Sequence, residues 1–235
     1  VTVYIGRFNP FHNGHAHVLL RALETSKLVI VLVGSSGQAR NTKNPLTFAD
    51  RKAMIEEWHE GLGGAAKFAL GRLVVLPIRD YPYNDALWIR QVQSIVKGAM
   101  KNMTGLKDIY VTGSDRDSST WYLNAFPQWK LDLVPPFRQD ETLNVSATMI
   151  RDWLFGPTDI ETQGKMAKFV PVATLRFLSK FSQTKEYDEL VYEYDFLKKY
   201  KKAWEAAPYA PTFVTSDAVV IQSGHILVIE RANMP

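Results

Sequence analysis

The sequence of 235 residues contains no cysteine. Disulfide bonds, thiolate metal sites and cysteine nucleophiles are therefore excluded, and because this composition suits a reducing compartment we expect a cytoplasmic protein. The sequence also lacks any apolar run near the roughly 20 residues that a membrane-spanning helix needs. No basic segment followed by an apolar one opens it, as a secretory signal would. We therefore expect no association with a membrane.

The sequence also lacks a large excess of either charge. The 28 lysines and arginines exceed the 24 acidic residues by only four, a net charge of +4. The basic residues are scattered, apart from Lys198-Lys199 and Lys201-Lys202, whereas nucleic-acid-binding domains gather them on one face. We therefore expect no nucleic acid partner. A modest positive excess suits small anionic ligands such as nucleotides.

The most informative stretch spans residues 6–15. It follows an apolar run, residues 1–5, that is typical of a buried strand, and it precedes a segment with helical apolar periodicity, residues 17–23. Turns from strand to helix bind phosphates, because N–H groups at a helix start lack partners and the helix dipole favours an anion there. Gly14 removes a side chain where backbone and phosphate approach closely.

Two histidines belong to this stretch. His12 and His15 are three residues apart, so on a first helical turn they would face the same way. Such a pair alone is more often two exposed surface histidines without a function, or half of a metal site. Combined with Arg7 and a helix start, the two imidazoles indicate a site for a polyphosphate whose charge rises during a reaction.

Strands and helices alternate along the following residues. Apolar runs that are typical of strands occur at residues 28–34, 73–78, 108–112 and 129–134. The near-continuous apolar character of residues 28–34 predicts a central parallel strand buried on both faces, and residues 129–134 predict a strand nearer the edge. The pattern predicts an α/β fold in which right-handed crossovers join parallel strands.

The loop after the third predicted strand carries polar residues at the edge where open parallel sheets bind ligands. Asp80 and Asn84 lie in this loop, and Trp88 follows at the start of the next helix. A tryptophan at a helix start is more often a core anchor than a platform for a ligand. A flat indole beside amide and carboxylate groups nevertheless suits an aromatic ring that bears a carboxamide.

Two further helix starts carry an arginine. Thr47 and Asp50 predict a capping box, and Arg51 follows them; on the sequence alone a solvated helix arginine is the favoured interpretation. Ser146 predicts the cap of another helix, with Arg151 about one turn inside it.

Together these motifs resemble a known superfamily. Residues 6–15, Gly-Arg-Phe-Asn-Pro-Phe-His-Asn-Gly-His, resemble the His-x-Gly-His signature of the nucleotidyltransferases, and in their longer form the nicotinamide mononucleotide adenylyltransferases of archaeal type. Residues 145–151 are similar to the second signature, Ile-Ser-x-Thr-x-x-Arg, with Val145 in place of isoleucine. Arg40 with residues 44–51, and residues 113–129, resemble further segments of that family.

The resemblance implies a Rossmann-like parallel sheet of five strands, with the active site at the carboxyl ends of the strands. It implies that ATP and nicotinamide mononucleotide give NAD and pyrophosphate. Because the sequence shows no cluster of metal ligands, we expect Mg²⁺ to arrive on ATP and no metal site in the protein. The implied catalytic residues are His12, His15 and Arg151. The implied ATP-binding residues are Gly6, Arg7, Phe8, Gly14, Arg51, Gly113, Asp115, Ser146 and Thr148. The implied mononucleotide-binding residues are Arg40, Asp80, Asn84 and Trp88.

The C-terminal part predicts other units. Apolar residues recur at helical spacing over residues 187–204, a face that we expect to pack against the body or against a second copy in a homo-oligomer. A proline-rich linker and a β-hairpin pattern at residues 212–221 and 225–231 follow. They resemble the junction between this adenylyltransferase and a Nudix hydrolase domain. We expect a transferase domain at 1–183, a helix and linker at 184–211, and an incomplete second domain at 212–235. The Nudix box is absent from the sequence, so we expect no hydrolase activity.

Other functions compete with this interpretation. A related adenylyltransferase could act on nicotinate mononucleotide or phosphopantetheine. A class I aminoacyl-tRNA synthetase also carries His-x-Gly-His, but the sequence contains no loop like Lys-Met-Ser-Lys-Ser. A hypothesis of another class is a regulatory module that binds NAD without turnover.

Overall fold

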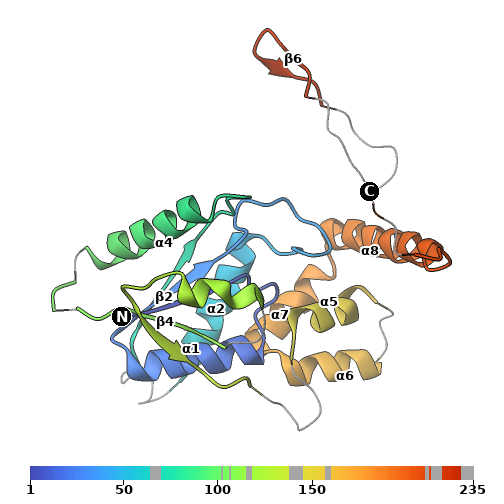
Figure 1. Ribbon diagram of the computed structural model, residues 1–235. Helices are drawn as coiled ribbons and strands as arrows, with labels where there is room; N and C mark the ends of the chain where they lie inside the picture. The colour runs from blue at the N-terminus through green and yellow to red at the C-terminus, as the bar shows by residue number, and fades with distance from the viewer. Residues whose placement is uncertain are drawn as a thin grey trace.

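The structure is a computed structural model that describes residues 1–63, 70–101, 103–105, 107–114, 118–137, 145–156, 160–209, 212 and 219–228 (Figure 1). Five parallel strands form one sheet in the order β3-β2-β1-β4-β5. The strands are β1 (Thr2–Gly6), β2 (Leu28–Val33), β3 (Arg72–Pro77), β4 (Tyr110–Gly113) and β5 (Lys130–Leu133). The predicted five-stranded parallel sheet is thereby confirmed, with β5 at an edge.

The order of the strands creates a crevice at the middle of the sheet. The chain adds β2 and β3 on one side of β1 and then adds β4 and β5 on the other side. The winding therefore reverses between β1 and β4, and ligands of open α/β sheets bind beyond the carboxyl ends of the strands at such a point. The residues after β1 and β4 accordingly lie where a site is expected.

The position of strand β2 explains why its sequence is apolar. All six of its residues are buried, because both faces of the sheet are covered. Val29, Val31 and Val33 enter one hydrophobic core, and Leu28, Ile30 and Leu32 enter the other. The two cores lie on opposite faces of the sheet, since successive side chains of a strand point to opposite sides.

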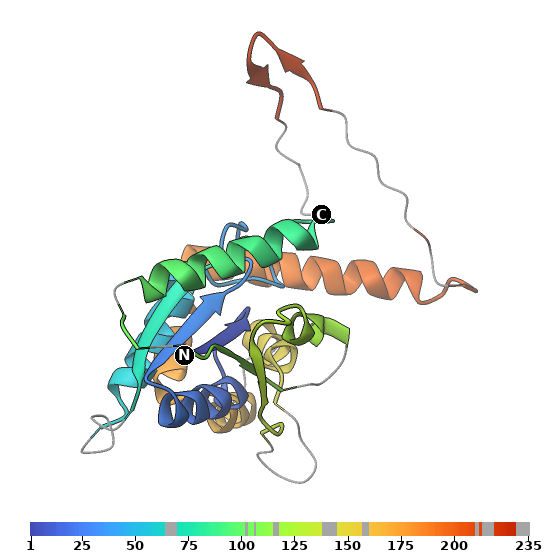
Figure 2. The ribbon, with the colours of Figure 1, turned by 60° about the vertical axis from the view of Figure 1, so that its left-hand side comes forward.

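Helices cover both faces. They are α1 (Asn13–Thr25), α2 (Phe48–Glu60), α4 (Asp85–Met100), the 3₁₀ helix η1 (Ser118–Asn124), α5 (Ala147–Phe155), α6 (Ile160–Phe169), α7 (Val172–Phe181) and α8 (Lys185–Trp204). Residues of α1, α2 and α5 to α8 join one core, and residues of α4 join the other. In Figure 2, α1 and α4 lie on opposite sides of the strands.

Local chemistry fixes several helix starts. The predicted capping box is present, because the Asp50 N–H donates to Thr47 Oγ1 (3.2 Å) and the Thr47 N–H donates to Asp50 Oδ2 (2.8 Å). The hydroxyl of Ser146 likewise accepts from the N–H of Met149 at 3.2 Å and caps α5. These bonds satisfy backbone donors that the helix itself leaves without a partner.

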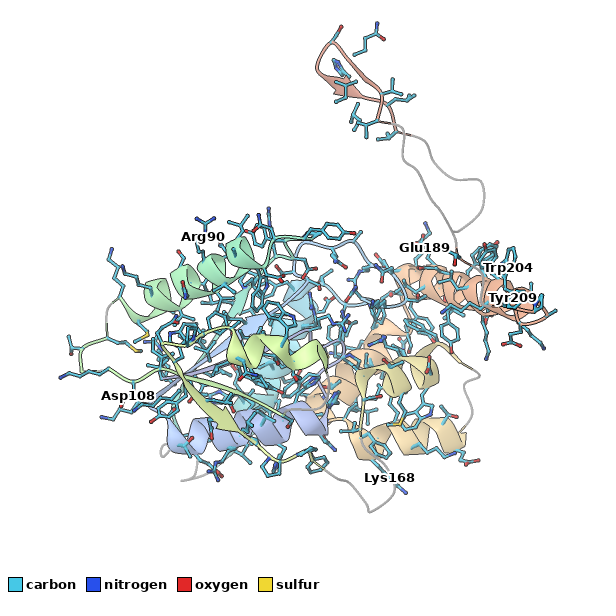
Figure 3. The ribbon with its side chains drawn as sticks, viewed as in Figure 1. Arg90, Asp108, Lys168, Glu189, Trp204 and Tyr209 are labelled. Carbon is cyan, nitrogen blue, oxygen red and sulfur yellow. The ribbon has the colours of Figure 1, made fainter. Side chains whose placement is uncertain are left out.

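Helix α8 packs on the body through its first half, as the apolar face predicts. Leu190 is buried in the core, the Tyr187 hydroxyl donates to the Leu154 carbonyl at 2.7 Å, and the Tyr194 hydroxyl donates to Asp152 Oδ1 at 3.2 Å. Figure 3 shows Trp204 at the far end of α8, where its side chain is exposed.

The predicted hairpin is present in a shorter form. Strands β6 (Ile221–Gln222) and β7 (His225–Ile226) pair in antiparallel fashion. Ser223 and Gly224 join them with φ values of 50° and 76°, the positive values that a tight hairpin turn requires. Of the rest of the predicted strands, residues 212, 219–220 and 227–228 are described and are not in strands, and residues 213–218 and 229–231 lie outside the described residues. Within the part of the chain that the structure describes, no helix is long and apolar enough to cross a membrane.

Close packing against the backbone requires a glycine at position 71, and this requirement gives a stability prediction. A Cβ at Gly71 would lie 1.8 Å from the carbonyl oxygen of Ser26, whereas one at Gly98 on α4 would meet nothing within 4 Å. Gly71→Ala should lower the free energy of unfolding by about 1–3 kcal/mol through overpacking. Gly98→Ala should raise it by about 0.5–1 kcal/mol through helix propensity. Urea denaturation measures both, and equal effects would contradict the packing at Gly71.

Candidate active site

Two adjoining cavities open beyond the carboxyl ends of the strands. The histidine cavity has a volume of about 320 Å³ and is lined by His12, His15 and Arg151 among others. The tryptophan cavity has a volume of about 700 Å³ and is lined by Trp88 and Asp80 among others. Six residues line both cavities: Ile5, Gly6, Arg7, Lys43, Thr120 and Tyr122. A molecule in one cavity can therefore contact a molecule in the other.

The two histidines start α1 and hold each other in place. His12 is the N-cap residue, and its Nδ1 accepts from the His15 N–H at 3.4 Å, while His15 Nδ1 accepts from the His12 N–H at 3.3 Å. Their rings stack with centroids 3.6 Å apart, so the prediction that they face the same way is confirmed. Because each Nδ1 accepts, each neutral ring carries its proton on Nε2 and can donate it from there.

Three cationic side chains line the histidine cavity, namely Arg7, Lys43 and Arg151, and no carboxylate lines it among the described residues. The Arg151 guanidinium donates to the Asn9 carbonyl at 2.8 Å and to Thr148 Oγ1 at 3.1 Å. Burial lowers the pKa of Arg151, and the positive charge of Arg7 lowers it further. Like charges held this close make the cavity complementary to a polyanion.

Two helix N-termini meet at the same cavity. The first turn of α1 contributes His15, and the first turn of α5 contributes Ala147 and Thr148. A Cβ at Gly14 would lie 2.9 Å from Val145 Cγ1 and 3.1 Å from the His12 ring. Gly14 therefore lets α1 approach the residue before the α5 cap. Both sets of helix-start N–H groups favour an anion at this point.

The tryptophan cavity combines an aromatic wall with a fixed carboxylate. Trp88 packs against Trp121, with ring centroids 5.4 Å apart, and against Phe126, at 6.2 Å. On another wall, the Gln38 amide donates to Asp80 Oδ2 at 2.7 Å, and the Asn44 amide donates to Gln38 Oε1 at 2.9 Å. This series of amides holds the Asp80 carboxylate at the cavity.

The structure brings most of the predicted site residues together. The histidine cavity is lined by seven of them: Gly6, Arg7, Phe8, His12, His15, Thr148 and Arg151. The tryptophan cavity is lined by Asp80 and Trp88. Gly113 and Ser146 directly precede lining residues, and Gly14 supports the lining from behind. Asp115 lies outside the described residues.

Two of the residues assigned to the mononucleotide have other partners. The Arg40 guanidinium donates to the Pro45 carbonyl at 2.6 Å, pairs with Asp50 at 2.9 Å and lies over the Phe181 ring. These partners hold it outside the lining of either cavity. Asn84 Oδ1 accepts from the Leu87 N–H at 2.9 Å, so the side chain caps α4 and is likewise absent from both linings.

Arg51, assigned to ATP, is also differently placed. Its side chain is 1% exposed, and its N–H groups donate to the carbonyls of Thr47, Arg7, Gly34 and Ser35. These carbonyls hold the guanidinium behind the cavity walls, so Arg51 lines neither cavity.

The structure adds residues that the motif analysis passed over. Lys43 lines both cavities and directly precedes the Asn-Pro segment used above, so its position there was the available signal. Tyr122, from η1, lines both cavities and donates from its hydroxyl to the Ile5 carbonyl at 3.1 Å. Among the described residues, no group of three or more histidine, aspartate or glutamate side chains could hold a metal ion.

Comparison with solved structures places this arrangement among enzymes of nucleotide metabolism. The structure matches a bifunctional NMN adenylyltransferase/ADP ribose pyrophosphatase from Francisella tularensis, crystallised with AMP and a Mn ion, with a TM-score of 0.77 and 35% identity. The match covers 96% of this chain and 61% of that one. The chain thus spans less than two thirds of the Francisella protein.

Sequence comparison identifies further relatives. The nicotinamide/nicotinic acid mononucleotide adenylyltransferase of Acinetobacter baylyi is 30% identical over 192 residues, which are 82% of this chain and 92% of that protein. The nicotinamide-nucleotide adenylyltransferase of Halorubrum lacusprofundi is 38% identical over 93 residues, 39% of this chain and 48% of that protein. Residues 3–153 match the sequence profile of the cytidylyltransferase-like family. The chain therefore belongs to the cytidylyltransferase-like family of nucleotidyltransferases.

Proposed function

We propose that the chain transfers the adenylyl group of ATP to nicotinamide mononucleotide and so forms NAD and pyrophosphate. One observation carries this proposal: a cavity with three cations, two histidines and two helix N-termini adjoins an aromatic cavity, and Arg7 and Lys43 line both. A polyphosphate fits the first cavity, a base with its ribose fits the second, and their phosphates meet at the shared wall. The names of the Acinetobacter and Halorubrum relatives support the same reaction.

The chemistry needs alignment and charge stabilisation rather than a protein nucleophile. A phosphate oxygen of the mononucleotide attacks the α-phosphorus of ATP, the new P–O bond forms, and the bond to the β-phosphate oxygen breaks so that pyrophosphate leaves with its electron pair. Holding two reactants in line can supply about 7–11 kcal/mol of the barrier. Donors already aimed at the developing charge supply more, because they need no reorganisation during the reaction.

The residues of the histidine cavity have matching roles in this proposal. His12 and His15 donate from Nε2 to the phosphates of ATP, with His15 nearest the transferring group. Arg7 and Arg151 neutralise the triphosphate, and the N–H groups and Thr148 at the start of α5 hold its distal end. Lys43, on the shared wall, balances the charge of the phosphates that approach from both cavities.

The tryptophan cavity holds the nicotinamide end. Trp88 offers the ring face on which the base stacks. Asp80 accepts hydrogen bonds from the mononucleotide, and Gln38 keeps that carboxylate in place. ATP enters as its magnesium complex, in which phosphate oxygens and water hold the cation. The Francisella protein was crystallised with AMP and a Mn ion, which supports a dependence on divalent cations.

Two neighbouring functions differ in one measurable product. Nicotinate mononucleotide as acceptor gives the deamido dinucleotide, and the Acinetobacter relative is named for both acceptors. A module that only binds NAD gives no product.

The transferase unit in our proposal comprises residues 1–183 with the first half of α8 packed against it. A cytoplasmic location, a homo-oligomer and a second domain beginning near residue 212 stay predictions.

The reaction itself is tested by incubating the protein with ATP, Mg²⁺ and each mononucleotide and measuring product mass. We expect NAD and pyrophosphate from nicotinamide mononucleotide. His15→Ala should lower kcat by about 10²–10³, the usual effect of removing one transition-state donor, and should also lower the free energy of unfolding modestly, because His15 Nδ1 accepts from the His12 N–H at the start of α1. Absence of any dinucleotide from the unmodified protein would refute the function, and near-normal turnover of the variant would remove His15 from the mechanism.

His12 has two functions that two substitutions separate. As the N-cap of α1 it accepts a backbone N–H, and loss of such a cap in His12→Ala should lower the free energy of unfolding by about 1 kcal/mol. Asparagine is a good N-cap, so His12→Asn should recover most of that stability. Both variants should lose turnover, because neither places an Nε2 donor at the phosphates. Full activity in His12→Asn would show that His12 serves only as a cap.

Trp88 is tested against a matched tryptophan of the same core. Trp88→Ala should raise KM for the mononucleotide about 5- to 150-fold, the value of roughly 1–3 kcal/mol for stacking on an aromatic ring, and leave KM for ATP nearly unchanged. Trp129 stacks on Phe126 with centroids 4.3 Å apart and lines neither cavity. Trp129→Ala should therefore affect stability without this change in KM. An equal change in KM in both variants would favour a core-anchor role for Trp88.

A further inference from the structure

Arg51 is a charged side chain held wholly inside the protein. It is 1% exposed, and four of its N–H donors have carbonyl partners. Nη1 donates to Arg7 and to Gly34 at 2.7 Å each, Nη2 donates to Ser35 at 3.3 Å, and Nε donates to Thr47 at 3.1 Å. A buried charge without such partners would be strongly destabilising. The role of Arg51 is therefore to be sought in these four bonds to backbone carbonyls.

The four carbonyls belong to three segments that are distant in sequence. Arg7 follows β1, Gly34 and Ser35 follow β2, and Thr47 caps α2. The planar guanidinium presents its five N–H donors in a fixed fork, so one side chain fixes the turns after two neighbouring strands relative to each other. A lysine at this position has only three donors on one nitrogen and cannot reproduce that geometry.

Both turns contain a residue in the left-handed backbone region. Phe8 has a φ of 51° and Ser35 has a φ of 49°, and non-glycine residues adopt such values at a cost. The Arg7 carbonyl belongs to the peptide bond that leads into Phe8, and the Gly34 carbonyl belongs to the one that leads into Ser35. Because Arg51 bonds to both carbonyls, it favours the orientation of these two peptide groups.

The same turns form the walls on which the two substrates would meet. Arg7 lines both cavities, Phe8 lines the histidine cavity, and Gly34 and Ser35 line the tryptophan cavity. A rotation of either peptide group would displace one cavity wall relative to the other. The rate of a reaction between two aligned molecules depends steeply on such displacements.

We propose that Arg51 is a positioning residue for adenylyl transfer: it sets the mutual geometry of the two cavity walls without touching the triphosphate. This inference depends on the function proposed above. Arg51 stays protonated at neutral pH, because burial lowers its pKa only to about 10, with Asp50 and Asp80 acting to raise it and Arg7 to lower it.

The distinguishing experiment measures kcat and KM separately in Arg51→Lys, which keeps the charge but loses the fork. We expect kcat to fall about 10- to 100-fold, since a misplacement of 1 Å far from the chemistry can lower the rate about 10²-fold. The KM values for ATP and for the mononucleotide should each change less than about 3-fold, since in this proposal Arg51 contacts neither substrate. Arg90→Lys, at an exposed position on α4 (Figure 3), is the matched control and should leave both constants unchanged. A rise of tenfold or more in KM for ATP with kcat retained would overturn the proposal and favour direct contact with the phosphates.

A second substitution tests the backbone part of the inference. Glycine adopts a positive φ without strain, so Ser35→Gly should lessen the dependence of the turn on Arg51. The double variant Arg51→Lys, Ser35→Gly should recover several-fold in kcat over Arg51→Lys alone, since the native φ of Ser35 already suits glycine. The single variant Ser35→Gly, measured beside it, serves as the reference for any effect of the lost hydroxyl. Lack of any recovery would overturn the proposed action through the turn.

Folding and function are separated by two further readings. Circular dichroism and the thermal midpoint of Arg51→Lys should show a folded protein at the assay temperature, and an unfolded variant would mean that Arg51 is needed for folding, not positioning. Absence of dinucleotide from the unmodified protein would refute the proposed function and this inference together. Normal turnover by the unmodified protein with an unchanged kcat in Arg51→Lys would refute this inference alone.

Discussion

The constraint on which this structure depends is the burial of positive charge at the end of β1. Burial lowers the pKa of Arg51 and of Arg151, and the charge of Arg7 lowers both further. Backbone carbonyls offset the cost of that burial: Arg151 donates to Asn9, and Arg51 donates to Arg7 and Gly34. The chain must therefore turn its carbonyls toward the guanidinium groups, and this requirement shapes the segment between β1 and α1.

The topology of the sheet makes this requirement compatible with a stable core. Strand β1 lies between β2 and β4, so the turn after it is flanked by the turns after both neighbours. The Gly34 N–H donates to the Gly6 carbonyl at 2.8 Å, and the Tyr122 hydroxyl donates to Ile5 from the other side. Below this layer the central strands β1 and β2 are buried on both faces, and they provide a rigid base for a cationic surface that a polyanion would complete.

The sequence predicts the features that depend on neighbours along the chain. The strands follow from apolar runs, the capping box at Thr47 spans three residues, and the histidine signature directly follows β1. Side-chain orientation over long separations could not be predicted. Arg51 bonds to Arg7, 44 residues away, and Arg40 lies over Phe181; nothing in the local sequence indicates either partner. A single lysine in a loop is usually solvated, so the position of Lys43 before the Asn-Pro segment was its one signal in the sequence.

The arginines also show that a motif does not by itself assign a role. Arg7, Arg51 and Arg151 all belong to segments that resemble nucleotide-binding signatures, and all three lie near one cavity. Only Arg7 and Arg151 line it, whereas the donors of Arg51 are directed to backbone carbonyls. A guanidinium that is 1% exposed reaches a ligand only by breaking bonds to carbonyls that would then be buried without partners, at about 1–3 kcal/mol for each group. In our proposal the same residue type therefore contacts the ligand where it lines the cavity, and acts as a fixed support where backbone carbonyls engage its fork.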